Sequence, residues 1–196
     1  MDVEFIKSAF QEKHYPPPDR PEIAFAGKSN VGKSSLLNTL VNRRKLARTS
    51  STPGRTQAIN FFRFGKTLYL VDLPGYGFAK VPTKIKKSWG LMVEDYLRTR
   101  KTLKAVVVIL DIRRDPSSGD EDLINWLNHY HIEPILVLTK ADKISRQKIN
   151  RRANLIIGGL KDVSFSRPVI FSSHTRQGVE ELWEIINETA LPPEET

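Results

Sequence analysis

The chain contains no cysteine, which excludes a disulfide framework and a thiol nucleophile. It also lacks long apolar runs: the longest, AVVVIL and ILVL, are far shorter than the about 20 residues that cross a bilayer. The first residues show no basic leader followed by an apolar block. We therefore expect a soluble, cytoplasmic protein that makes no membrane contact.

Basic residues are absent from residues 178–196, a segment that holds six glutamates. All 31 Lys and Arg lie in residues 1–177 against 16 Asp and Glu, so this part carries a net charge of +15, compared with +9 for the whole chain. Such an excess favours a polyanionic partner, most commonly nucleic acid, although a basic surface that only keeps the protein in solution is the alternative. No RRM, KH or zinc-knuckle pattern is present, so RNA would be bound by surface side chains. The candidates are Arg43, Arg44, Lys45, Lys84, Lys86, Lys87, Arg151 and Arg152.

Apolar runs typical of strands alternate with stretches of helical periodicity, which predicts an α/β protein with helices on both faces of a mostly parallel sheet. We expect three layers and six strands, at residues 22–26, 57–64, 67–71, 105–111, 135–139 and 169–173. Residues 57–64 are expected to turn back as an antiparallel strand at the sheet edge. One domain is predicted over 21–191, with a loosely attached extension at 1–20 and a tail at 192–196. Helices are indicated by the spacing of Ile85, Trp89, Met92 and Tyr96, of Leu123, Trp126, Leu127 and Tyr130, and of Leu182, Ile185 and Ile186.

The first strand runs into GKSNVGKS, from Gly27 to Ser34, which fits the phosphate-binding pattern G-x-x-x-x-G-K-[ST] between a strand and a helix. Glycines let the backbone amides turn toward phosphates, Lys33 reaches the β and γ oxygens, and the Ser34 hydroxyl can bind Mg²⁺. A simple glycine-rich turn is the alternative, and the full agreement of spacing and context argues against it.

The base is indicated by TKAD, Thr139 to Asp142, at the carboxyl end of a strand where open α/β sheets bind ligands. A carboxylate at Asp142 can accept from the N1–H and 2-amino groups of guanine, whereas adenine offers neither donor. Lys140 would lie along the base with its stem. A strand end followed by a helix cap is the plainer interpretation of these four residues.

The order GKSNVGKS, TPGRTQ, DLPGYG, TKAD and FSS resembles the translation-factor-related GTPases. The longer strings ARTSSTPGRTQAINFF and VDLPGYGFAK are similar to those of the EngB family, also called YihA or YsxC, over about residues 21–191. The resemblance implies a Ras-like P-loop GTPase fold, binding of GTP, GDP and Mg²⁺, a partner in the large ribosomal subunit (rRNA and ribosomal proteins), and roles in its assembly and in cell division and septation. We expect a monomer.

The resemblance also implies roles for single residues. Thr56 would be the second hydroxyl ligand of Mg²⁺, with Thr49 and Thr52 as competing turn residues, and Asp72 would hold the ion through water. The amide of Gly75 would donate to the γ-phosphate, so that Lys33, Thr56 and Gly75 form the catalytic set. The full predicted nucleotide site is Gly27, Lys28, Ser29, Asn30, Val31, Gly32, Lys33, Ser34, Ser35, Gly54, Arg55, Thr56, Gln57, Ala58, Asp72, Leu73, Pro74, Gly75, Thr139, Lys140, Ala141, Asp142, Phe171, Ser172 and Ser173. Ser172 and Ser173 would present backbone donors to the guanine carbonyl.

The segment VDLPGYGFAK is predicted to move with the γ-phosphate, together with the basic helix that follows it. Many GTPases carry a glutamine after the DxxG glycine to orient water, but Tyr76 stands there, so slow hydrolysis is expected. Some relatives use a potassium ion held partly by a P-loop asparagine, and Asn30 matches that position. A role for Asn30 in bracing the loop is the equal alternative.

Two other functions remain open from the sequence. A P-loop kinase would need a lid of positive residues, for which Arg113 and Arg114 are candidates, although TKAD and DLPG argue against it. A non-hydrolysing RNA-binding scaffold would explain the basic charge without catalysis. A comparison of the affinities for GTP and ATP distinguishes a kinase from a GTPase. Measurement of phosphate release with and without ribosomal subunits distinguishes a non-hydrolysing scaffold from a GTPase.

Overall fold

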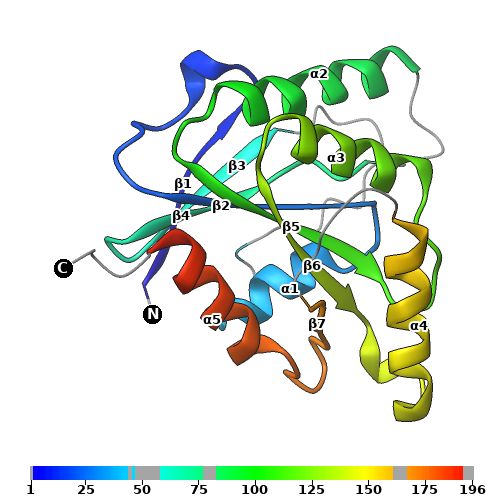
Figure 1. Ribbon diagram of the computed structural model, residues 1–196. Coiled ribbons are helices and arrows are strands. Elements are labelled where there is room, and N and C mark those ends of the chain that lie inside the picture. Colours follow the sequence, from blue (N-terminus) through cyan, green and yellow to red (C-terminus); the bar gives the residue numbers. More distant parts are fainter. Residues whose placement is uncertain (1, 44–45, 47–57, 77–82, 161–166, 192–196) are drawn as a thin grey trace.

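The computed structural model describes residues 2–43, 46, 58–76, 83–160 and 167–191, with the backbone alone for 83–89. In these residues a single sheet carries helices on both faces (Figure 1). Its seven strands lie in the order β1-β3-β4-β2-β5-β6-β7. They are β1 Val3–Ala9, β2 Glu22–Gly27, β3 Ile59–Phe64, β4 Leu68–Asp72, β5 Leu103–Asp111, β6 Glu133–Thr139 and β7 Val169–Ile170. The predicted fold class is confirmed, with one strand more than expected.

The sheet is parallel except at β3. Strands β2, β4, β5, β6 and β7 pair in parallel, whereas β3 is antiparallel to both β4 and β1. The antiparallel direction of β3 was predicted, but its place at the edge was not correct. The reason is β1, which pairs with the outer side of β3 and becomes the edge itself.

Five α-helices cover the described sheet. They are α1 Lys33–Leu40, α2 Thr83–Thr99, α3 Ser118–His129, α4 Arg146–Gly159 and α5 Val179–Ala190, with short 3-10 turns at Glu12–His14 and Ala141–Lys143. Helices α1 and α5 lie on one face of the sheet and α2 and α3 on the other, with α4 beside α3 (Figure 1). None of the described helices is long and apolar enough to cross a membrane.

Each face of the sheet has its own apolar core. Leu36 and Leu37 of α1 and Leu182 of α5 are buried against one face, while Tyr96 of α2 and Leu123 of α3 are buried against the other. Consecutive side chains of a strand point to opposite faces, so near-continuous apolar strands such as AVVVIL supply both cores at once.

The first residues of the chain are tied to the domain, so the expected loose attachment is wrong for β1. Arg100 also holds the segment that follows, because its guanidinium donates to the carbonyl of Pro16 at 2.9 Å. The same guanidinium donates to the buried carboxylate of Glu22 at 2.7 Å. Hydroxyl groups of Tyr96 and Thr102 complete the set of donors to Glu22, at 2.7 and 2.9 Å.

The last predicted strand is shorter than expected. Only Val169–Ile170 pairs with β6, and the chain turns away at Ser172, whose amide donates to the carbonyl of Gln177 at 3.1 Å. This turn brings the FSS segment toward the end of β6, because the amide of Ala141 donates to the carbonyl of Phe171 at 3.2 Å.

Candidate functional site

Three sequence motifs meet at the carboxyl edge of the sheet. The P-loop follows β2, DLPG follows β4, and TKAD follows β6. Because these strands are parallel neighbours or lie one strand apart, their ends open onto the same edge. The first two motifs touch directly, since Lys28 and Tyr76 form an isolated parallel bridge.

Two positions of the P-loop require glycine. A Cβ on Gly27 would lie 2.8 Å from the carbonyl oxygen of Ile109, so only glycine allows β2 and β5 to approach this closely. Gly32 has a φ of 107° at the start of α1, a conformation that side chains disfavour. Asn30 adopts a φ of 66°, which asparagine tolerates better than most residues. Close approach of β5 at Gly27 and a positive φ at Gly32 therefore explain why the P-loop has glycine at these two positions.

Lys33 and Asp72, both predicted site residues, form an ion pair at the centre of the site, with each side chain 12% exposed. Lys33 opens α1 and Asp72 closes β4, so the two motifs are joined here. The Ser34 hydroxyl lies on the next residue of the first turn of α1. Carboxylate and hydroxyl oxygens are ligands that suit Mg²⁺, which keeps several waters and uses few protein groups. The donor set therefore fits the predicted ion.

The DLPG turn is docked on both the P-loop and α3. The carbonyl of Tyr76 accepts from the Ser29 amide at 2.8 Å and from the Ser29 hydroxyl at 3.0 Å. Its phenol donates to Asp120 at 2.6 Å, and a Cβ on Gly119 would lie 3.0 Å from its ring. Burial, followed by the charge of Asp120, raises the pKa of Tyr76 well above its usual value. Leu73 of the same turn is buried, and its amide donates to the carbonyl of Phe25 at 3.0 Å.

The TKAD segment forms hydrogen bonds to two carbonyl groups of the P-loop. Thr139 is buried, and its hydroxyl donates to the carbonyl of Val31 at 2.6 Å. Lys140 has a φ of 62°, and its ammonium donates to the carbonyl of Asn30 at 2.7 Å. The predicted base-binding and phosphate-binding segments therefore form one unit.

Asp142 is held by the FSS segment. Its Oδ1 accepts from the hydroxyl of Ser172 at 2.8 Å, and its Oδ2 lies 3.2 Å from the ammonium of Lys143. The hydrogen bond from Ser172 keeps the pKa of Asp142 below its usual value. Ser172 therefore acts through its hydroxyl, while its amide is engaged with Gln177. Of the two predicted backbone donors, Ser173 is the one whose amide makes no hydrogen bond within the described chain.

A carboxylate that sequence reasoning did not assign lies behind the P-loop. Asp111, the last residue of β5, is 6% exposed and accepts two hydrogen bonds from the Arg113 guanidinium, at 2.9 and 2.7 Å. Arg113 is thus committed to Asp111, which weakens its candidacy as a kinase lid. The position of Asp111 directly after the buried run AVVVIL was the signal that could have identified it.

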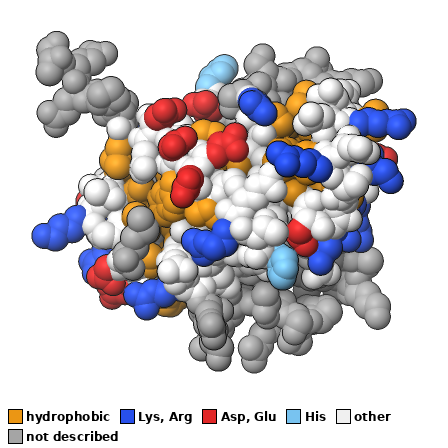
Figure 2. Space-filling view, turned by 90° about the horizontal axis from the view of Figure 1, so that it is seen from below, with side chains coloured by type: hydrophobic (Ala, Val, Ile, Leu, Met, Phe, Trp, Pro, Cys, Tyr) orange, Lys and Arg blue, Asp and Glu red, His pale blue; other side chains and the backbone are white. Residues whose placement is uncertain are grey.

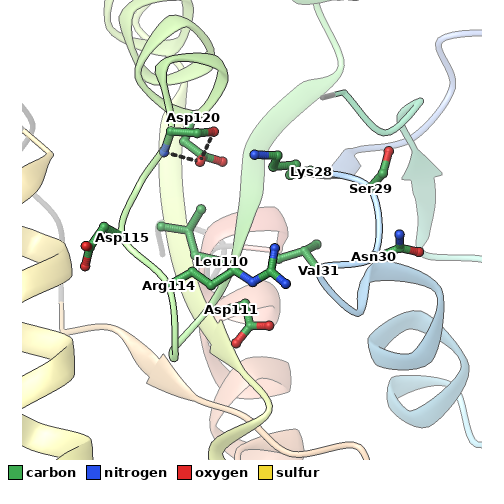
Figure 3. Close-up of a pocket in the computed structure, with 10 residues that line it drawn as sticks. Lys28, Ser29, Asn30, Val31, Leu110, Asp111, Arg114, Asp115 and Asp120 are labelled. Atoms are coloured by element: carbon green, nitrogen blue, oxygen red, sulfur yellow. Dashed lines mark hydrogen bonds between the residues drawn. The ribbon is translucent and has the colours of Figure 1, made fainter. Parts of the chain in front are cut away.

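The same region contains a small cavity of about 50 Å³ between the P-loop and the start of α3 (Figure 3). Lys28, Asn30, Asp111, Arg114 and Asp120 are among its lining residues. Ser117 also lines the cavity, and its amide donates to the carboxylate of Asp120 at 2.7 Å at the start of α3. The cavity therefore has both basic and acidic side chains in its lining.

Several predicted residues lie outside the described part of the chain. These are Gly54, Arg55, Thr56 and Gln57 of the predicted site, the alternatives Thr49 and Thr52, and the basic residues Arg44 and Lys45. The side chains of Lys84, Lys86 and Lys87 are likewise not described. Arg43 and Arg151 are exposed, whereas Arg152 is engaged with the carbonyl of Ile112 and the carboxylate of Asp115, each at 3.0 Å.

Comparisons with known proteins agree with this geometry. A family model described as 50S ribosome-binding GTPase matches residues 22–140. The "probable GTP-binding protein EngB" of Geotalea daltonii is 55% identical over 192 residues, covering 98% of this chain and 92% of the relative. The chain belongs to the EngB family of GTP-binding proteins. The EngB protein of Geobacter metallireducens is 53% identical over 181 residues, covering 92% of this chain and 88% of the relative.

A solved structure supports the fold independently. The crystal structure of a probable GTP-binding protein EngB superimposes with a TM-score of 0.70 at 23% identity, covering 86% of this chain and 98% of that chain. The resemblance of the motif strings to EngB is therefore confirmed, and with it the P-loop GTPase fold.

Proposed function

We propose that this EngB protein is a slow, magnesium-dependent GTPase switch that acts in the cytoplasm on the large ribosomal subunit during its assembly, and that cell division and septation depend on it. The observation that carries the nucleotide part is the placement of Asp142. Its carboxylate accepts a hydrogen bond from Ser172, and Lys140 of the same TKAD segment donates to the carbonyl of Asn30 in the P-loop. The segment that would bind guanine is therefore in direct contact with the loop that would bind the phosphates.

Discrimination against ATP follows from the chemistry of this carboxylate. Guanine offers two donors to Asp142, whereas adenine would leave the charge unpaired, at a cost of a few kcal/mol. The low pKa of Asp142 keeps it ionised at neutral pH. Lys33 would bind the β and γ phosphates on release from Asp72, while Asp72, through water, and Ser34 and Thr56 would hold Mg²⁺, which neutralises phosphate charge.

Slow hydrolysis follows from Tyr76. Its phenol donates to Asp120 on α3, while its carbonyl accepts from Ser29 of the P-loop. A phenol cannot both donate and accept in the geometry of the glutamine amide that positions the attacking water in many GTPases. A group from the ribosome or a monovalent cation would have to stabilise the developing charge.

A potassium ion at Asn30 is the cation hypothesis. The carbonyl of Asn30 is taken by Lys140, and in the described chain its side-chain amide makes no hydrogen bond that would brace the loop. Single-turnover hydrolysis in KCl and in NaCl at equal ionic strength, for wild type and Asn30→Ala, tests the hypothesis. Equal wild-type rates in the two salts would remove it and leave a ribosomal group as activator.

The ribosomal part of the proposal rests on charge and on the family model, whose description names the 50S subunit. On the face drawn in Figure 2, several acidic side chains gather in one group, while Lys and Arg side chains, with a few further acidic ones, are spread around it. The exposed glutamates of α5 are Glu180, Glu181, Glu184 and Glu188. Because rRNA is a polyanion, we expect it to contact the basic surface away from α5, as a monomer bound to one subunit.

The experiment is co-sedimentation with separated large and small ribosomal subunits in the presence of GTP, GDP or no nucleotide. We expect GTP-dependent binding to the large subunit that weakens steeply with salt, with a log–log slope of roughly 0.7 to 0.9 for each phosphate neutralised. Equal binding to both subunits, or binding independent of nucleotide, would contradict the ribosomal role. GTP affinity above ATP affinity tests the nucleotide part separately.

A further inference from the structure

Asp111 lies where two parallel strands end side by side. It pairs in register with Thr139, and the next residue of that strand is Lys140. The left-handed conformation of Lys140 turns its side chain back over the P-loop, and its ammonium lies 3.0 Å from Oδ2 of Asp111. The carboxylate therefore faces the lysine that contacts the phosphate-binding loop.

Asp111 is itself held in a single orientation. The Arg113 guanidinium donates to both of its oxygens, and the Arg113 amide donates to Oδ1 at 3.1 Å. Burial alone would raise the pKa of Asp111, but the hydrogen bonds from Arg113 and Lys140 hold it well below its usual value. The result is a permanently charged acceptor with little freedom to rotate.

The orientation of Lys140 has consequences for the P-loop peptides. The ammonium holds the carbonyl of Asn30 outward, and the Thr139 hydroxyl does the same for the carbonyl of Val31. A trans peptide is planar, so an outward carbonyl turns the following N–H toward the inside of the loop. The amide of Gly32 is directed in this way toward the position of the phosphates, whereas the amide of Val31 donates to the carbonyl of Lys28 at 3.1 Å and closes the turn of the loop.

We infer that Asp111 is a positioning residue for nucleotide binding, which acts through Lys140 to fix both the stem beneath the base and the peptide plane of Asn30. This inference rests on the proposed guanine-nucleotide site. Asp111 itself touches neither base nor phosphate in this role, and no motif of the sequence assigned it.

Removal of the charge should release Lys140. In Asp111→Asn the ammonium would keep only the neutral carbonyl of Asn30, and since its side chain is 29% exposed it could turn into water. Affinity would fall by about tenfold, in the range of a lost hydrogen bond to a charged group. GDP and GTP should weaken equally, because the base and the loop amides are common to both, and kcat should change less than twofold.

The matched control is Asp115→Asn. Asp115 lies in the same connection between β5 and α3, makes the same type of ion pair with Arg152, and is 83% exposed. Stopped-flow measurement of the release rate of a fluorescent GDP analogue compares the two variants with the wild type. Thermal unfolding checks that each variant is folded. We expect faster release from Asp111→Asn only. Its Tm should fall, because the lowered pKa of Asp111 means that its charge stabilises the fold, so release is compared at a temperature at which both variants are fully folded.

A double-mutant cycle with Lys140→Met separates positioning from general support, because methionine keeps the stem and removes the charge. If Asp111 acts through Lys140, Asp111→Asn should cost less than twofold in the Lys140→Met background. A tenfold loss in both backgrounds, or no loss in the wild-type background, would overturn the inference. Failure of the wild type to bind GDP would instead overturn the proposed function.

Discussion

Glu22 and Asp111 are both buried carboxylates paired with an arginine. They lie at opposite ends of two neighbouring parallel strands, Glu22 at the amino end of β2 and Asp111 at the carboxyl end of β5. Glu22 begins β2, is fully buried, and receives donors from Tyr96, Arg100 and Thr102. Asp111 ends β5 and shares its charge with Arg113 and Lys140, whose side chains are 39% and 29% exposed. The groups around Glu22 are buried inside the fold, whereas the groups around Asp111 reach the P-loop through Lys140.

The difference follows from the direction of the strands. Ligands of parallel sheets bind at the carboxyl edge, so polar groups at that edge remain available to loops and nucleotide, while those at the amino edge serve only the fold. We therefore expect changes around Glu22 to affect stability without affecting the nucleotide, and a change at Asp142 to affect nucleotide affinity with little effect on stability.

The largest effect is expected for Arg100→Met, which leaves the carboxylate of Glu22 buried without its cation. Breaking one side of a buried ion pair costs about 3–5 kcal/mol of unfolding free energy. Urea unfolding measures it, with Arg98→Met as control, since Arg98 forms an exposed pair with Asp95 and should change stability by about 0.5 kcal/mol or less. Weaker GDP binding by the folded Arg100→Met protein would break the proposed division between the two edges.

The converse change is Asp142→Asn, which places an amide opposite the guanine donors. We expect GTP and GDP affinity to fall by about 3 kcal/mol, while the Tm changes little because Asp142 is held only at the rim by Ser172 and Lys143. Calorimetric titration gives the affinity. Unchanged GTP affinity would remove Asp142 from the base site.

A smaller effect is expected for Tyr76→Phe, which keeps the ring over Gly119 and removes the bond to Asp120. Loss of a hydrogen bond to a charged acceptor should lower stability by about 1.5–3 kcal/mol in the absence of nucleotide. Tyr130→Phe is the control, because the Tyr130 phenol meets Glu94 at 3.2 Å on a half-buried surface. Equal losses for the two variants would show that docking of the DLPG turn adds nothing of its own.

The smallest effect concerns alkaline pH at the amino edge. Burial, and then the charge of Asp95, raises the pKa of Tyr15 to about 12. The unfolded chain releases this proton near pH 10, so the contribution is complete below about pH 10 and is lost as the pH rises toward 12. Urea midpoints between pH 9 and 11 should therefore fall less steeply for Tyr15→Phe than for wild type, and identical slopes would contradict the shift.

Most of the sheet could be predicted because its parallel strands are buried on both faces and read as apolar runs. Strand β1 could not, since its pattern VEFIKSA places exposed residues on both faces of an edge and contains a bulge near Ile6. Helix α4 was missed because charged and amide side chains fill most of its surface and few residues are buried, among them Ala153 and Ile156. In both cases the tertiary partner, rather than the local pattern, decides the structure.

The site divides in the same way. Loop motifs with fixed spacing predicted Lys33, Asp72 and Asp142 as site residues, because a strand end and a glycine pattern are local signals, and the structure joins Lys33 and Asp72 in an ion pair. The contacts of Asp111 with Lys140 and of Tyr76 with Asp120 join segments 29 and 44 residues apart, and no local pattern reports such pairs. The bond of Ser172 to Asp142 was missed for the same reason.

Strand β1 has a mechanical consequence for the proposed GTPase switch. Its ladder runs from Val3 opposite Phe64 to Ala9 opposite Ile59, and Ser8 donates to Asn60 at 2.7 Å at the end where β3 begins. A hairpin held by a strand on its outer side cannot slide along β2 without breaking that ladder. If the proposed switch moves with the γ-phosphate, we expect the register of β3 and β4 to stay unchanged and the far end of the hairpin at Gly65 to stay still through the nucleotide cycle.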